Sequence, residues 1–110
     1  MKIGLIRCLQ TEDICQATTD FKVMKNKKGA FEGIEEEIEI VGVVSCGGCP
    51  GKKAVSRAAE MVKRGADAIA MASCISRGTP IGFPCPNAEM IIDTIKKKAG
   101  DSVRLFEFTH

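Results

Sequence analysis

An apolar segment that runs directly into a pair of cysteines constrains this chain most. Residues 41–44 read Val-Gly-Val-Val, and they are followed by Ser45, a Cys-Gly-Gly-Cys turn at residues 46–49 and a helical pattern that begins near Pro50. This order is typical of a buried strand, a tight glycine turn and the first turn of a helix. Two thiols three residues apart are typical of a metal-chelating or redox-active pair. We therefore expect a strand–turn–helix unit that carries chemistry at its turn.

The other predicted strands end in the same kind of residue. Residues 1–7 lead into Cys8, residues 67–73 into Cys74 and residues 103–109 into His110. The carboxyl ends of parallel strands lie at one edge of a sheet, where open α/β sheets place their sites. Cysteines used only as small buried hydrophobes would be scattered through strand interiors and helix stripes, and none of the six is. The sequence thus predicts one shared cysteine-rich site.

The order of the predicted elements indicates an α/β fold. Strands are expected at 2–7, 38–45, 67–73 and 103–108, and helices at 18–28, 50–64 and 87–99, the first capped by Thr18 or Thr19 and ended by Gly29. A β-α-β-α-β-α-β order predicts a three-layer, flavodoxin- or Rossmann-like domain with a four-stranded parallel sheet, right-handed crossovers and the cysteines at the carboxyl edge. Residues 38–45 are almost continuously apolar, which predicts a central strand buried on both faces. The alternating residues 103–108 suit an edge strand.

Composition limits the classes of function. The chain has 110 residues, 45% of them hydrophobic, which suits one domain spanning residues 1–110 with one core. A net charge of +2 and the absence of Trp and Tyr argue against a nucleic-acid partner. No apolar run suits a signal peptide or a membrane span, so we expect a cytoplasmic protein without a membrane partner. In that compartment six cysteines are more typical of metal ligands or catalytic groups than of disulfides.

The candidate ligands form an inner set and a set of alternates. The inner set joins the turn pair to the thiols at two other strand ends: Cys8, Cys46, Cys49 and Cys74. The alternates are Cys15, Cys85 and His110; His110 is the only histidine, and a terminal residue can also be a frayed tail. Cys85 lies between two prolines in a loop expected at residues 75–86, and loops of that length tend to be functional.

Soft thiolates select zinc, copper(I) or an iron–sulfur cluster, so zinc is the first expectation and a cluster the alternative. The spacing matches neither a ferredoxin nor a zinc ribbon, and the motifs of cysteine phosphatases, Walker loops and zinc deaminases are absent. A second hypothesis is a thiol–disulfide oxidoreductase in which Cys46 attacks and Cys49 resolves. A third is an interaction module in which the cysteines are only a structural staple. The sequence does not decide which protein partner, if any, is involved.

The motifs together resemble the CGGC domain family of small, cysteine-rich prokaryotic proteins. The resemblance spans the whole chain and rests on the central Ser-Cys-Gly-Gly-Cys-Pro-Gly-Lys run at residues 45–52 and on residues 6–8, 11–13, 65–67, 72–75, 82–86 and 109–110. It implies a single CGGC-type α/β domain with zinc bound by cysteine and histidine. Relatives often carry a histidine after the Cys-Pro pair, where this chain has Asn87, so the chain departs from the family pattern at that position.

Overall fold

The computed structural model describes all residues from 1 to 110 and has an α/β architecture. The strands are β1 (Lys2–Arg7), β2 (Glu39–Ser45), β3 (Ala68–Met71) and β4 (Arg104–Phe106). The helices are α1 (Thr18–Asn26), α2 (Lys52–Lys63), α3 (Ser73–Ser76) and α4 (Ala88–Ala99), with a short 3₁₀ helix, η1 (Gly29–Phe31). All four strands pair in parallel in the order β2-β1-β3-β4. The predicted fold class is confirmed.

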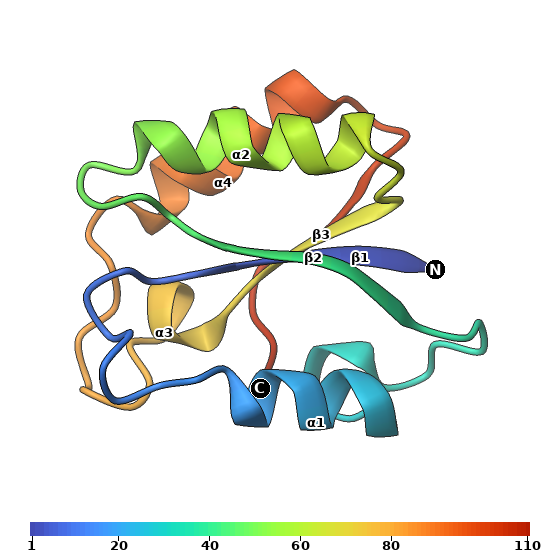
Figure 1. The fold of residues 1–110 in the computed structure, drawn as a ribbon, viewed down its shortest axis with the longest axis horizontal. Helices are drawn as coiled ribbons and strands as arrows, with labels where there is room; N and C mark the ends of the chain where they lie inside the picture. The colour runs from blue at the N-terminus through green and yellow to red at the C-terminus, as the bar shows by residue number, and fades with distance from the viewer.

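Helices cover both faces of the sheet. In Figure 1, α1 and η1 lie below the strands, and α2 and α4 lie above them. The connection from β1 to β2 runs toward one edge of the sheet, and the connection from β3 to β4 runs toward the opposite edge. Connections of one hand that run in opposite directions place their helices on opposite faces, which produces the three layers. The two directions diverge between β1 and β3, and this switch point is where open α/β sheets bind ligands.

The prediction that residues 38–45 form a central strand is wrong. β2 is an edge strand, and the two central strands are β1 and β3. The β1–β2 register shifts between Ile3 and Gly4, whose partners are Ile40 and Gly42, so Val41 lies in a bulge. Val41 and Val43 are each 41% exposed. Ile38, Ile40 and Val44 are half-buried against the core, and a continuous apolar pattern does not distinguish such an edge strand from the centre of the sheet. The predicted edge position of β4 is confirmed.

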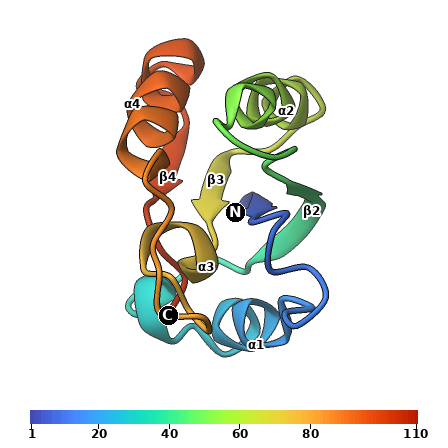
Figure 2. The ribbon, with the colours of Figure 1, turned by 90° about the vertical axis from the view of Figure 1, so that its left-hand side faces the viewer.

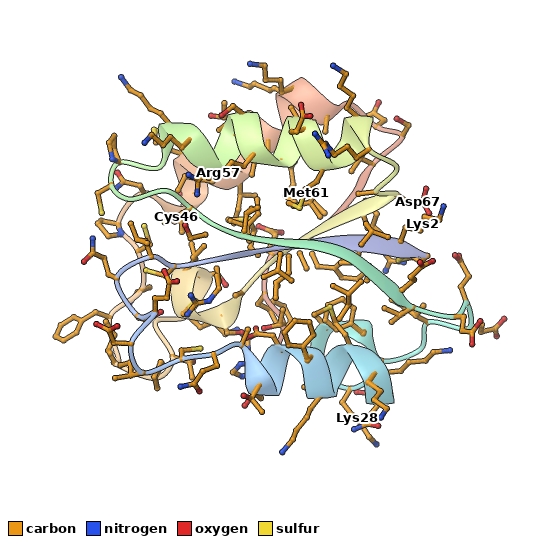
Figure 3. The ribbon with its side chains drawn as sticks, in the orientation of Figure 1. Lys2, Lys28, Cys46, Arg57, Met61 and Asp67 are labelled. Carbon is orange, nitrogen blue, oxygen red and sulfur yellow. The ribbon has the colours of Figure 1, made fainter.

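Glycines let helix α2 approach the sheet closely. Gly4 and Gly42 are paired across β1 and β2. A Cβ atom at Gly4 would lie 2.7 Å from the Met61 sulfur, and one at Gly42 would lie 3.2 Å from it. Figure 3 shows Met61 pointing from α2 toward the strands. On the opposite face, the rings of Phe31 and Phe106 pack with their centroids 4.6 Å apart.

Several element boundaries differ from the predicted ones. β3 ends at Met71, and residues 73–76, expected as strand end and loop, form the helical turn α3 that contains Cys74. The residue preceding α1 is Ala17, in a left-handed conformation without a side-chain cap, where Thr18 or Thr19 was expected. Ala17 is buried in the core, so packing determines this helix start. None of the helices is both long and apolar enough to cross a membrane.

Candidate functional site

The cysteines that follow β1, β2 and β3 meet at the carboxyl edge of the sheet. The backbone N–H of Cys8 donates to the Cys74 sulfur at 3.2 Å, and the N–H of Leu9 lies 3.5 Å from the Cys46 sulfur. These two sulfur atoms therefore flank the first two residues after β1, beside the switch point. Figure 2 looks onto this edge, with the connections after the strands gathered toward the viewer. The positions of these cysteines at the strand ends predicted that they lie close together, and in the structure they do.

The Cys-Gly-Gly-Cys turn depends on its first glycine. Gly47 has a φ of 80°, and a Cβ atom there would lie 2.7 Å from the Cβ of Lys53. Such a position excludes other residues on both conformational and steric grounds. Arg57 of α2 donates to the carbonyl and the hydroxyl of Ser45, each at 3.0 Å. This contact places a guanidinium charge beside the start of the turn (Figure 3).

Four of the six cysteines line one small cavity, which we call the apolar thiol cavity. Its cysteines come from three separate segments: Cys8 from the loop after β1, Cys46 and Cys49 from the Cys-Gly-Gly-Cys turn, and Cys85 from the loop before α4. Cys46 is buried and Cys49 is exposed, whereas Cys8 and Cys85 are half-buried. Ile75 and Ile91 contribute apolar walls, and the cavity volume is about 20 Å³. Such a volume holds about one water molecule or one ion.

Three of the sulfur atoms lie in hydrogen-bonding range of a backbone N–H. Besides the contacts to Cys74 and Cys46, the N–H of Asn87 lies 3.4 Å from the Cys85 sulfur. A hydrogen bond donated to sulfur favours the charged thiolate. At Cys74 this effect is outweighed, because burial raises the pKa of its thiol.

The remaining predicted residues line a different cavity, which we call the polar thiol cavity. Its volume is about 170 Å³, and its walls include Cys15, Cys74, Asp20 and His110, with the hydroxyl residues Thr18 and Thr79. The two cavities share no lining residue. The single shared site expected from the sequence is therefore divided in two, and Cys85 joins the Cys46/Cys49 pair in place of Cys74.

His110 is fixed in the structure, unlike a frayed tail. Its backbone N–H donates to the Ser73 hydroxyl oxygen at 2.9 Å, and its carbonyl accepts from that hydroxyl at 2.9 Å and from Arg77 at 3.0 Å. Its Nε2 lies 3.9 Å from Oδ1 of Asp20. The buried Asp20 carboxylate accepts a hydrogen bond from the Thr109 hydroxyl.

Sequence reasoning missed the residues that support the two cavities. Asp20, Ser73 and Thr109 form a buried network whose members are far apart in the chain, so no local pattern indicates it. Arg7 is buried at the end of β1, where its guanidinium donates to the Cys15 carbonyl and lies 3.7 Å from Glu12. The sequence did contain a signal for Arg7, because this charged residue directly follows the apolar residues 3–6 of β1.

Thiol groups suit a soft metal ion, but the cysteine side chains do not converge on one point in the structure. In the structure all six cysteines are free, and no group of three or more His, Cys, Asp or Glu side chains is close enough to hold a metal ion. Ligation by the four thiols of the apolar thiol cavity would require their side chains to rotate toward its centre.

Comparison with known proteins agrees with the motifs. A family model described as the CGGC domain matches residues 2–110. An uncharacterized protein of Methanocaldococcus jannaschii is 35% identical over 81 residues. That alignment covers 67% of this chain and 62% of the relative, so the chain spans less than two thirds of the relative's length. No solved structure matches the chain.

Proposed function

The chain belongs to the CGGC domain family, and we propose that its apolar thiol cavity binds a soft metal ion, in the first place zinc, through Cys8, Cys46, Cys49 and Cys85. The observation that carries this proposal is that four thiols from three separate segments line one ion-sized cavity. Four cysteines are the complete ligand set of a closed structural zinc site.

The surroundings of the four thiols support a soft cation as the ligand. The walls are largely apolar, so a thiolate that faces the cavity has few polar partners there and would be stabilised by a cation. Backbone N–H groups lie near the sulfurs of Cys46 and Cys85, and hydrogen bonds of this kind orient metal ligands. The volume of about 20 Å³ suits a single ion and is small for a cluster of several iron and sulfide atoms.

A bound ion would act mainly by cross-linking segments. It would join the loop after β1, the Cys-Gly-Gly-Cys turn and the loop that contains Cys85. Because thiols must lose their protons to bind, the affinity would rise with pH and binding would stabilise the fold. The other three candidates, Cys15, Cys74 and His110, line the polar thiol cavity and lie outside the proposed ligand set.

Metal content and zinc competition test the proposal. We expect anaerobically purified chain to hold about one equivalent of zinc and to compete with a chromophoric chelator for it. Cys46→Ser and Cys85→Ser should each lower the zinc affinity by at least about tenfold, since even residues that only orient ligands contribute that much. Cys15→Ser makes the same chemical change in the other cavity and should leave the zinc affinity unchanged. Equal affinities for all four proteins, or an apo protein that takes up no zinc, would contradict the proposal.

Visible absorbance distinguishes zinc from a cluster. Because the chain has no Trp or Tyr, its own ultraviolet absorbance is weak and a sulfur-to-iron band near 400 nm would be clear. A zinc-loaded sample should be colourless.

A second candidate function is thiol–disulfide exchange by Cys46 and Cys49. The exposed Cys49 lies at the turn with the buried Cys46 behind it, which suits an attacking thiol and a resolving thiol. This exposure reverses the roles expected from the sequence, where Cys46 was the attacking residue. Insulin reduction that is abolished by Cys49→Ser and unaffected by a zinc chelator would favour this function over metal binding.

A further inference from the structure

The polar thiol cavity contains a pair of thiols that the proposed metal site does not use. Cys74 is only 5% exposed, whereas Cys15 is half-buried at the end of the turn after β1. Both residues line the cavity, together with the carboxylate of Asp20 and the imidazole of His110. None of these groups lines the apolar thiol cavity.

Thr11 links the two cysteines. The Thr11 carbonyl accepts the N–H of Cys15 at 2.8 Å, and the Thr11 hydroxyl donates to the carbonyl of Cys8 at 3.4 Å. The N–H of Cys8 in turn donates to the Cys74 sulfur at 3.2 Å. The Cys15 carbonyl is held in addition by the buried guanidinium of Arg7. The backbone around Cys15 is thus fixed beside Cys74.

From this juxtaposition we propose that Cys15 and Cys74 form a second, independent dithiol pair that reduces small polar disulfides through the polar thiol cavity. The more accessible Cys15 attacks one sulfur of the disulfide, whose S–S bond breaks, and a mixed disulfide forms as the first small thiol leaves. Cys74 then attacks the Cys15 sulfur, which releases the second small thiol and forms a Cys15–Cys74 disulfide. Two electrons pass from the two cysteines to the substrate, and their two protons leave on the two small thiols.

The cavity determines the substrate class. At about 170 Å³ it is smaller than a typical drug-sized pocket, so it admits only the reacting end of a substrate. Its hydroxyl and imidazole groups suit a polar rather than an aliphatic disulfide. Oxidised glutathione is a convenient probe of this class.

Peptide mapping of the full chain tests the pair directly. The zinc-loaded protein is incubated with oxidised glutathione, its free thiols are alkylated, and it is digested with trypsin and a glutamyl endopeptidase. Cleavage after Arg7, Glu12 and Lys22 separates Cys8 from Cys15, and cleavage after Arg64 and Arg77 isolates Cys74. We expect a disulfide between peptides 13–22 and 65–77. A disulfide between peptides 8–12 and 65–77, or a Cys74 that stays alkylated, would overturn the proposal.

Two variants define the order of attack. Cys74→Ser should accumulate one glutathione on Cys15, because the resolving thiol is missing. Cys15→Ser should leave Cys74 reduced and free of glutathione. If either variant fails to fold, the map of the unchanged protein still decides the question. Zinc affinity should be the same in Cys15→Ser as in the unchanged protein, so failure of this pair and failure of the metal site are distinguishable.

Discussion

At the scale of single residues, the environment of each sulfur atom sets what the thiol can do. Cys46, Cys74 and Cys85 each have a backbone N–H in hydrogen-bonding range, and Cys49 is exposed at a glycine turn. The Cys-x-x-Cys spacing and the positions after strands predicted that these residues carry chemistry. The hydrogen bond to the Cys74 sulfur could not be predicted, because its donor, the N–H of Cys8, lies 66 residues away in the chain.

Cys74 should make the stability of the metal-free protein depend on alkaline pH. Burial raises the pKa of its thiol above the ordinary value of 9.0, so the folded state holds this proton more tightly than the unfolded state does. The neutral Cys74 thiol contributes fully to the free energy of unfolding at pH values below its ordinary pKa. This contribution is lost as the pH rises through the pKa of the thiol in the folded state. Urea unfolding between pH 7.5 and pH 10 should show a smaller loss of stability in Cys74→Ala than in the unchanged protein.

Cys49→Ala is the matched control for this titration, because it removes an exposed thiol. It should retain the full alkaline loss of stability. The same pH dependence in Cys74→Ala and Cys49→Ala would show that Cys74 is not the group responsible.

At the scale of elements, local patterns predicted which segments are strands and helices but not where each one lies. Residues 39–45 were correctly expected as a strand, yet the β1–β2 bulge at Val41 and the edge position follow from long-range pairing. The turn α3 was missed because only four residues form it, too few for a helical period. The start of α1 was also mispredicted. A threonine cap was expected, but the residue before the helix is Ala17, which is buried in the core and has no capping side chain.

The close approach of α2 to the sheet predicts a compensating pair of substitutions. Gly4→Ala should destabilise the protein by about 1 kcal/mol, at the low end of overpacking costs, because the new methyl group displaces only the flexible end of the Met61 side chain. Met61→Ala should cost about 2–5 kcal/mol through the cavity it leaves. In the double variant the new methyl group at position 4 occupies the space that Met61 leaves. The loss of stability of the double variant should therefore be smaller than the sum of the losses of the two single variants. Additive losses in urea unfolding would contradict this contact.

At the scale of the whole molecule, the parallel sheet brings all of the chemistry to one edge. The switch point between β1 and β3 places Cys8 beside Cys74, and the turn after β2 adds Cys46 and Cys49. This gathering could be predicted from strand order along the chain. Its division into an apolar and a polar cavity could not, because it depends on how the loops that carry Cys15 and Cys85 fold over the edge.

The sulfur count around bound zinc tests the central claim most directly. X-ray absorption at the zinc edge measures the type and number of ligands in the fully loaded protein. We predict four sulfur atoms at about 2.3 Å, and three in Cys85→Ser with one lighter ligand in the vacated position. A shell dominated by nitrogen or oxygen at about 2.0–2.1 Å, or an unchanged sulfur count in Cys85→Ser, would contradict the assignment of zinc to the apolar thiol cavity.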